Sequence, residues 1–321
     1  MKHSLCVVES FLTDAHRAKI EETAARCDCT VQYYATPEEA DVSQCEILYS
    51  HFPQLVPQAK NLRWYCCSYA GVDPYITQEG KRLFCHPDCL LTNSSGAYGT
   101  AISEHMVMVT VMLLRRMPEY AAIVRARQWT NNLPVRSIRG SRVTVLGTGD
   151  IGSSYAHRIR AMYPASLSGV SRSGRAVPDF DRVVDVAHLD ELLPETDILA
   201  VCLPATGDTV GLLSRERLAL LPETAILINV GRGSVLDQEA LVEALRAGRL
   251  SGAALDVMTP EPLPQDHPLW SMENVLLTPH VSGNMTVGYT CDRDVEMFCD
   301  DLERYGAGKP LTHLVDRTLG Y

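Results

Sequence analysis

The sequence predicts an α/β protein of two domains, one of them built on a doubly wound parallel sheet. Its 321 residues exceed the length of one ordinary domain. Strand-like and helix-like segments alternate along the chain, which is typical of parallel sheets with right-handed crossovers. A β-branched run at residues 143–146 leads directly into Gly-x-Gly-x-x-Gly at residues 147–152. This is the strand–turn–helix pattern that binds the phosphates of a dinucleotide.

The first part of the chain consists of short predicted strands and surface helices. Residues 14–27 are polar and alanine-rich, and we expect a helix there with Thr13 or Asp14 as its N-cap. The strand-like runs are residues 5–9, 30–34, 46–49, 62–67 and 90–92.

One long helix is expected over residues 98–127, whose middle is apolar nearly all round. Such a helix is typically buried, here between domains or between subunits. Glu104 and His105 lie within it and could be catalytic. We favour the simpler interpretation, a satisfied polar pair at a helix junction.

The second part of the chain continues the alternation of strands and helices. Helices are expected over residues 153–162 and over residues 237–247, the latter ending at Gly248. A last helix at residues 289–305 is expected to return to the first part. The expected domains are therefore residues 1–97 with 287–321, and residues 98–286. Strand-like runs occur at residues 143–146, 166–170, 182–185, 197–203, 225–230, 252–257 and 275–277.

Each glycine of the 147–152 motif has a separate physical role. Gly147 makes the tight turn, Gly149 lets a pyrophosphate approach the backbone, and Gly152 lets the helix pack closely on the strand. The phosphates are expected at the helix N-terminus, where N–H groups and the helix dipole favour negative charge.

Composition excludes several classes of function. The net charge of -10 and the isoelectric point near 5.5 argue against nucleic acid as a partner, because phosphates select a basic face. No apolar run is long enough to span a membrane and no signal-peptide layout opens the chain, so a cytoplasmic protein is expected. The 11 cysteines are scattered, which favours reduced thiols. Cys85, His86 and Cys89 lie close together without a second pair at zinc-finger spacing, so we expect no metal.

Three polar residues follow strand-like runs in the second part: Arg232, Glu261 and His280. Because ligands of such sheets bind at the carboxyl ends of the strands, these residues are candidates for catalysis. Arg232 can hold a carboxylate in a forked pair and polarise a carbonyl. His280 can give a proton to a carbonyl oxygen as hydride reaches the carbon, and Glu261 can orient its imidazole.

These motifs resemble the D-isomer-specific 2-hydroxyacid dehydrogenase family over nearly the whole chain. The matching stretches are residues 68–73 (SYAGVD), 147–152 (GTGDIG), 229–233 (NVGRG), 254–257 (ALDV) and 278–280 (TPH). The resemblance implies a Rossmann-type domain, a discontinuous flavodoxin-like substrate domain and a cleft between them. It also implies a homodimer, formed through the Rossmann domain and residues 98–127.

Family roles transfer to individual residues of this sequence. The family's catalytic Arg–Glu–His set falls on Arg232, Glu261 and His280, of which the arginine and the histidine also bind substrate. Its carboxylate-binding loop falls on Ala70, Gly71 and Val72, whose backbone N–H groups suit an anion. Its nicotinamide contact falls on Asp256. With the glycine motif, the expected cofactor-binding residues are Gly147, Gly149, Asp150, Ile151, Gly152, Leu203, Pro204, Val230, Gly231, Asp256, Ser282 and Gly283.

The residues after the next strand bear on the choice of cofactor. NAD-dependent members carry an acidic residue about 20 positions beyond the glycine turn, where it holds the ribose hydroxyls. This chain has Ser171, Arg172 and Arg175 there. Because these side chains can bind a 2′-phosphate, we expect NADP(H) to be preferred, with NAD(H) still possible.

Departures from the family pattern bear on the substrate. Residues 49–52 lack the arginine that enzymes for phosphorylated substrates place near here, and little chain follows His280. A 3-phosphoglycerate dehydrogenase is therefore the alternative, not the first choice. Glu261, where formate dehydrogenase has Gln, disfavours that relative. Glyoxylate and hydroxypyruvate reductases fit better, reducing small 2-keto acids to D-2-hydroxy acids. Candidates for the side-chain pocket are His51, Phe52, Tyr69, Tyr98 and Met285.

A binding protein is the rival class of function. Corepressors of the C-terminal-binding-protein type keep this fold and this catalytic set and use the dinucleotide to drive assembly. They also carry extended disordered tails, and this chain has no polar low-complexity extension. The enzyme is the favoured hypothesis.

Overall fold

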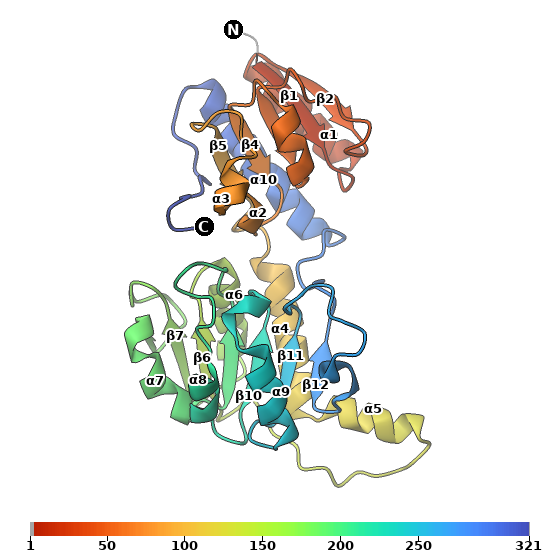
Figure 1. The fold of residues 1–321 in the computed structure, drawn as a ribbon, viewed down its shortest axis with the longest axis vertical. Helices are drawn as coiled ribbons and strands as arrows, with labels where there is room; N and C mark the ends of the chain where they lie inside the picture. The colour runs from red at the N-terminus through yellow and green to blue at the C-terminus, as the bar shows by residue number, and fades with distance from the viewer. Residues whose placement is uncertain (1–2, 321) are drawn as a thin grey trace. The chain divides into compact units, whose positions relative to one another are not determined.

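A computed structural model describes residues 3–320, apart from the side chain of Gln78. The chain forms two compact units (Figure 1). The first contains the described residues up to Tyr98 and from Met285 onward, and the second contains Gly99–Asn284. Each unit has one parallel sheet with helices on both faces. The predicted α/β class is therefore confirmed.

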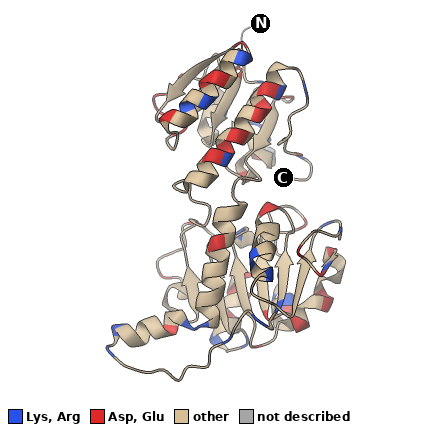
Figure 2. Ribbon diagram, turned by 180° about the vertical axis from the view of Figure 1, so that it is seen from behind, with Lys and Arg blue, Asp and Glu red and all other residues tan. Residues whose placement is uncertain are grey.

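The first unit has five strands in the order β2-β1-β3-β4-β5. Two long helices, α1 (Asp14–Arg26) and α10 (Gly288–Gly306), pack together over one face, which Figure 2 shows from behind. The core beneath them includes Trp64 and Tyr49, both of which stack on Phe298. The other face is covered by η1 (Pro53–Gln58), α2 (Asp73–Ile76) and α3 (Gln78–Lys81). The strands are β1 (His3–Val8), β2 (Cys29–Tyr34), β3 (Ile47–Ser50), β4 (Trp64–Cys67) and β5 (Leu90–Asn93).

The second unit has seven strands in the order β12-β11-β10-β9-β6-β7-β8. Helices α4 (Gly99–Leu114) and α6 (Asp150–Arg160) pack together on one face (Figure 2). Helices α7 (Leu189–Leu192), α8 (Arg215–Leu220) and α9 (Gln238–Arg246) cover the other (Figure 1). Short η helices occur at Val186–His188, Leu193–Glu195, Gly233–Val235 and Pro268–Ser271. The strands are β6 (Arg142–Leu146), β7 (Ser166–Val170), β8 (Arg182–Val184), β9 (Ile198–Val201), β10 (Ile226–Asn229), β11 (Gly252–Leu255) and β12 (Val275–Leu277).

Several predicted helix ends are confirmed by local chemistry. Thr13 caps α1: its hydroxyl accepts a hydrogen bond from the backbone nitrogen of His16, and the His16 ring accepts one from the backbone nitrogen of Thr13. Helix α9 ends where Gly248 takes a φ of +66°. The last helix, α10, lies in the first unit.

Two predicted helices are corrected. The single helix over residues 98–127 was wrong, because α4 ends at Leu114 and α5 (Met117–Arg125) begins after Arg116, whose φ is +54°. Pro118 lacks the N–H that a continuous helix needs, so the break falls just before it. No residue of α5 is buried, and in α4 one face is buried while Met108 and Val111 are exposed, so the expected burial holds only for that face of α4. The helix after the glycine motif also begins earlier than predicted, at Asp150.

Candidate active site

The glycine turn lies where the strand order of the second sheet reverses. Strands β6 and β9 are neighbours there, and Gly147 follows β6. Its φ of +95° is one that glycine adopts without strain. A Cβ on Gly152 would lie 1.8 Å from the carbonyl oxygen of Gly147, whereas a Cβ on Gly149 would meet nothing within 4 Å. Gly152 is therefore required by packing, and the space beside Gly149 at the start of α6 is open.

Arg232 is held between two glycines that touch neighbouring strand ends. A Cβ on Gly231 would lie 2.5 Å from the oxygen of Leu203, and one on Gly233 would lie 2.2 Å from the oxygen of Met258. The side chain of Asn229 fixes the same turn by donating to the oxygen of Arg232 and accepting from the nitrogen of Gly231. The loop after β10 therefore packs closely between the loops after β9 and β11.

Asp256, directly after β11, fixes the loop that carries His280. Its buried carboxylate accepts hydrogen bonds from the Thr278 hydroxyl (2.6 Å), the Val281 nitrogen (2.9 Å) and the Ser282 nitrogen (3.0 Å). Burial acts to raise the pKa of Asp256, but the hydrogen bonds from Ser282, Thr278 and Val281 outweigh it and hold the pKa below its ordinary value. Asp256 thus joins the ends of β11 and β12.

His280 and Glu261 form a direct pair. Nδ1 of His280 lies 2.8 Å from Oε2 of Glu261, and Oε1 of the same carboxylate accepts from the nitrogen of Met258 at 2.9 Å. The His280 backbone has a φ of +52° and donates to the oxygen of Asp256. The His280 side chain is half-exposed. No residue that the structure describes makes a hydrogen bond to its Nε2. The ring is therefore oriented through one nitrogen, and the other remains available to a ligand.

Arg232, Glu261 and His280 follow β10, β11 and β12, three adjacent strands of one sheet. They therefore share the carboxyl edge with the glycine turn, as do the remaining cofactor candidates. Leu203 and Pro204 follow β9, Val230 follows β10, and Ser282 and Gly283 follow β12. The roles of these residues stay predictions.

The residues expected to select the cofactor form a tight turn after β7. The Ser171 hydroxyl accepts from the nitrogen of Gly174 at 3.2 Å, and the Ser171 nitrogen donates to the oxygen of Val184. Arg172 and Arg175 are exposed on this turn. The nearby Asp185 accepts hydrogen bonds from the His188 ring and the Ala187 nitrogen, so its carboxylate is already engaged.

The expected carboxylate-binding loop, residues 70–72, belongs to the first unit and follows β4. The side chain of Asn93 donates to the oxygen of Ala70 at 2.7 Å. Tyr98, a candidate for the substrate pocket, donates to the oxygen of Ser68 at 2.7 Å and contacts the sulfur of Met285.

Sequence reasoning missed Glu9 and Asp294, two of the buried carboxylates of this unit. Glu9 bonds the Ser68 hydroxyl and the ring of His51. Asp294 bonds the hydroxyls of Tyr49 and Ser94, and burial raises its pKa to about 8 although those two hydrogen bonds act in the opposite direction. Glu9 stands directly after β1, the same signal that singled out Arg232; Asp294 lies within a helix and had none.

Other candidates have other partners. Glu104 lies 3.8 Å from Arg158 and His105 lies 3.4 Å from Thr278, so each of the two residues has a polar partner. Burial lowers the pKa of His105. All 11 cysteines are free thiols. No group of three metal-ligating side chains occurs among the described residues, and no described helix is long and apolar enough to cross a membrane.

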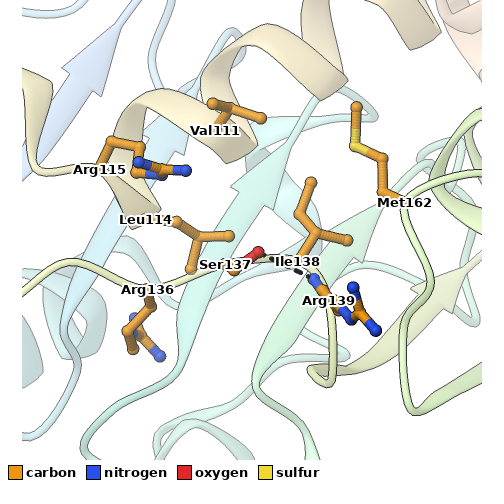
Figure 3. Close-up of a pocket in the computed structure, with 8 residues that line it drawn as sticks. All are labelled: Val111, Leu114, Arg115, Arg136, Ser137, Ile138, Arg139 and Met162. Atoms are coloured by element: carbon orange, nitrogen blue, oxygen red, sulfur yellow. Dashed lines mark hydrogen bonds between the residues drawn. The ribbon is translucent and has the colours of Figure 1, made fainter.

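A pocket of about 180 Å³ lies near the end of α4, at the amino end of the second sheet (Figure 3). None of the candidate site residues lines it. Its walls are Val111, Leu114, Arg115, Arg136, Ser137, Ile138, Arg139 and Met162.

Comparison with known proteins agrees with this geometry. Residues 107–282 match the family described as D-isomer specific 2-hydroxyacid dehydrogenase, NAD binding domain. The chain is 31% identical over 282 residues to glyoxylate/hydroxypyruvate reductase A of Klebsiella pneumoniae, covering 84% of this chain and 86% of that protein. An NADPH-dependent glyoxylate/hydroxypyruvate reductase from Sinorhizobium meliloti, solved with NADP and sulfate, has a TM-score of 0.82 and 29% identity, with 100% of both chains covered. A D-isomer specific 2-hydroxyacid dehydrogenase from Xanthobacter autotrophicus, solved with NADPH and MES, has a TM-score of 0.84 and 27% identity, again over 100% of both chains.

The fold and the polar strand ends define a dehydrogenase with a nicotinamide dinucleotide cofactor. The chain belongs to the D-isomer specific 2-hydroxyacid dehydrogenase family.

Proposed function

We propose that this protein reduces a small 2-keto acid of the glyoxylate or hydroxypyruvate type to the D-2-hydroxy acid. The observation that carries the proposal is the His280–Glu261 pair on the same sheet edge as Arg232 and the glycine turn. Relatives named glyoxylate/hydroxypyruvate reductase support the choice of substrate.

In the proposed reaction, Arg232, His280 and Glu261 of the second unit have separate roles. A bound nicotinamide cofactor supplies the hydride. Arg232 binds the carboxylate of the keto acid and polarises its carbonyl. His280 gives a proton from Nε2 to the carbonyl oxygen, and takes it back in the oxidative direction. Glu261 holds the ring through Nδ1, which stabilises the imidazolium that donates this proton.

The residues around the glycine turn suit a dinucleotide. The N-cap residue of α6 is Gly149, which has no side chain to cap the helix, so the first N–H groups can face phosphate oxygens. The open space beside Gly149 leaves room for such an approach. We assign phosphate binding to residues 147–152 and the 2′-phosphate of NADPH to Ser171, Arg172 and Arg175. NADH lacks that phosphate and is expected to bind more weakly. The second unit is then the dinucleotide-binding domain and the first the substrate domain.

We further propose that two copies of the chain associate through the second unit. Figures 1 and 2 show α5 and the segment after it extending away from the rest of this unit, with few charged residues along the helix. Met117, Val124 and Trp129 in this region are exposed, the last at 98%. A second copy would bury this apolar surface. Sedimentation equilibrium should give a dimer, and Trp129→Ser with Val124→Ser should weaken it.

A panel of 2-keto acids, assayed in parallel with NADPH and NADH, tests the proposed reaction. Glyoxylate or hydroxypyruvate should be reduced with NADPH at a higher kcat/KM than with NADH. The His280→Ala protein, purified in the same way, is the control for reductase activity of contaminating proteins. If none of the acids is reduced with either cofactor, the proposed function is wrong.

A further inference from the structure

Three polar residues stand in a row along the carboxyl edge of the first sheet. Glu9 comes directly after β1, His51 directly after β3 and Ser68 directly after β4. These strands are neighbours in the order β2-β1-β3-β4-β5. In a sheet of this order the ligand crevice lies between β1 and β3, where the strand order reverses. Glu9 and His51 meet at that point.

The contacts among these residues orient His51 through one ring nitrogen. The carboxylate of Glu9 is fully buried and accepts from the Ser68 hydroxyl through Oε1. Its Oε2 lies 2.9 Å from Nδ1 of His51. No described residue bonds Nε2 of His51.

Aromatic rings hold the imidazole from the sides. The His51 ring stacks on Tyr69, with centroids 4.6 Å apart, and lies 3.9 Å from the ring of Phe52. Tyr69 is 43% exposed and directly precedes Ala70, the first residue of the expected carboxylate-binding loop. An oriented ring nitrogen therefore stands beside the loop that would hold the substrate carboxylate.

We propose that His51, positioned by Glu9, determines specificity by recognising a hydroxyl on C3 of the keto acid, an inference that rests on the proposed function. With Nδ1–H bonded to the carboxylate, neutral His51 offers a lone pair at Nε2, and protonated His51 offers an N–H. A hydroxyl can both donate and accept, so it pairs with Nε2 in either state. A methyl group pairs in neither, and leaves the nitrogen desolvated without a partner. The preferred class is thus the 3-hydroxy-2-keto acids.

Hydroxypyruvate and pyruvate, which differ in that hydroxyl, provide the test. The wild-type enzyme with NADPH should show a kcat/KM roughly tenfold or more higher for hydroxypyruvate, because a site built around a hydroxyl rejects the analogue that lacks it. His51→Phe keeps an aromatic ring between Tyr69 and Phe52 but removes Nε2. This variant should have a higher KM for hydroxypyruvate, so that its kcat/KM is about equal for the two acids. Its kcat for hydroxypyruvate, and its kcat and KM for pyruvate, should be nearly unchanged. Glu9→Gln should give an intermediate ratio, because the ring loses its anchoring charge.

The His313–Asp301 pair provides a matched control in the same unit. Its side chains are 18% and 2% exposed, against 20% and 0% for His51 and Glu9, and both pairs are 2.9 Å long. His313→Phe should lower the melting temperature by about as much as His51→Phe does. It should leave the ratio of kcat/KM for hydroxypyruvate to kcat/KM for pyruvate unchanged.

The outcomes separate this inference from the proposed function. If the wild-type enzyme has equal kcat/KM for hydroxypyruvate and pyruvate, the proposed role of His51 is wrong, but the proposed reductase function is not affected. This measurement needs no variant. A His51→Phe protein that loses kcat equally for both acids, or a control that shifts the ratio as much, also overturns it. If no keto acid is reduced by the wild type, both proposals fail together.

Discussion

Nδ1 of His280 lies 2.8 Å from Oε2 of Glu261, a residue 19 positions earlier in the chain. The two loops that carry them leave adjacent strands, and Asp256 ties those strand ends together. The pair is thus held by the sheet itself, which gives the candidate proton donor a defined orientation.

Replacing His280 by Ala should lower kcat for glyoxylate by about 10²–10⁴-fold, the usual contribution of a positioned general acid. NADPH binding, followed by protein-to-nucleotide fluorescence transfer, should stay within about threefold of wild type. Glu261→Gln retains an acceptor for Nδ1 without its charge, so its kcat should fall less. If His280→Ala has a kcat near that of wild type, His280 is not the proton donor and the proposed mechanism is wrong.

Replacing Arg172 by Ala should raise the KM for NADPH by about 10–100-fold and hardly change that for NADH. The physical reason is that a charge-assisted bond to the 2′-phosphate is available only in NADPH. Arg215→Ala is the control, because this exposed arginine pairs with Glu243 away from the turn. Equal effects on the two cofactors would contradict the assignment of Arg172.

Two glycines of one motif should behave differently when replaced by Ala. Gly152→Ala forces a Cβ against the oxygen of Gly147 and should destabilise the protein by about 3 kcal/mol, measured by urea unfolding. Gly149→Ala meets no protein atom, so its free energy of unfolding should stay near wild type. Its KM for NADPH should still rise by roughly tenfold, because the methyl group occupies the open space. Unchanged cofactor affinity in Gly149→Ala would place the phosphates elsewhere.

Replacing Asp256 by Asn should lower both stability and turnover. The amide has one acceptor oxygen, so it cannot serve Thr278, Val281 and Ser282 as the carboxylate does. We expect a loss of about 2–4 kcal/mol in urea unfolding, together with a lower kcat as the His280 loop loses its anchor. Asp266→Asn, an exposed change in the same unit, should have neither effect. A stable Asp256→Asn protein of full activity would show that the anchor is dispensable.

Asp294 should make stability depend on pH. Burial raises its pKa to about 8 from an ordinary value of 3.8, so the folded protein binds a proton that the unfolded chain has released. The stabilisation is complete below about pH 4 and is lost as the pH rises through about 8. Asp294→Asn mimics the protonated acid.

Across that range, wild type should lose on the order of a few kcal/mol relative to Asp294→Asn in urea unfolding. Asp300→Asn, an exposed change on α10, should follow the wild-type pH profile. Parallel profiles for wild type and Asp294→Asn would show that the Asp294 carboxyl is ionised in the folded protein.

Much of the fold could be read from local patterns, because their causes are local. The glycine motif demands a positive φ at Gly147 and a missing Cβ at Gly152, and both demands are visible in a few neighbouring residues. The position of Arg232, Glu261 and His280 after strands was visible in the same way. The break at Arg116 was missed although Pro118 signals it, because the apolar run before it resembles one continuous helix.

The sequence by itself determined the α/β class, the glycine turn and the edge on which Arg232, Glu261 and His280 lie, because strand ends and turns follow from short-range sterics and hydrogen bonding. Only the tertiary structure decided which of these side chains meet. Glu9 contacts His51 and Ser68 across 42 and 59 residues of chain, and Asp294 reaches Ser94 across 200. Such pairings depend on strand order and burial, which the packing of the whole unit sets and no short stretch of sequence contains.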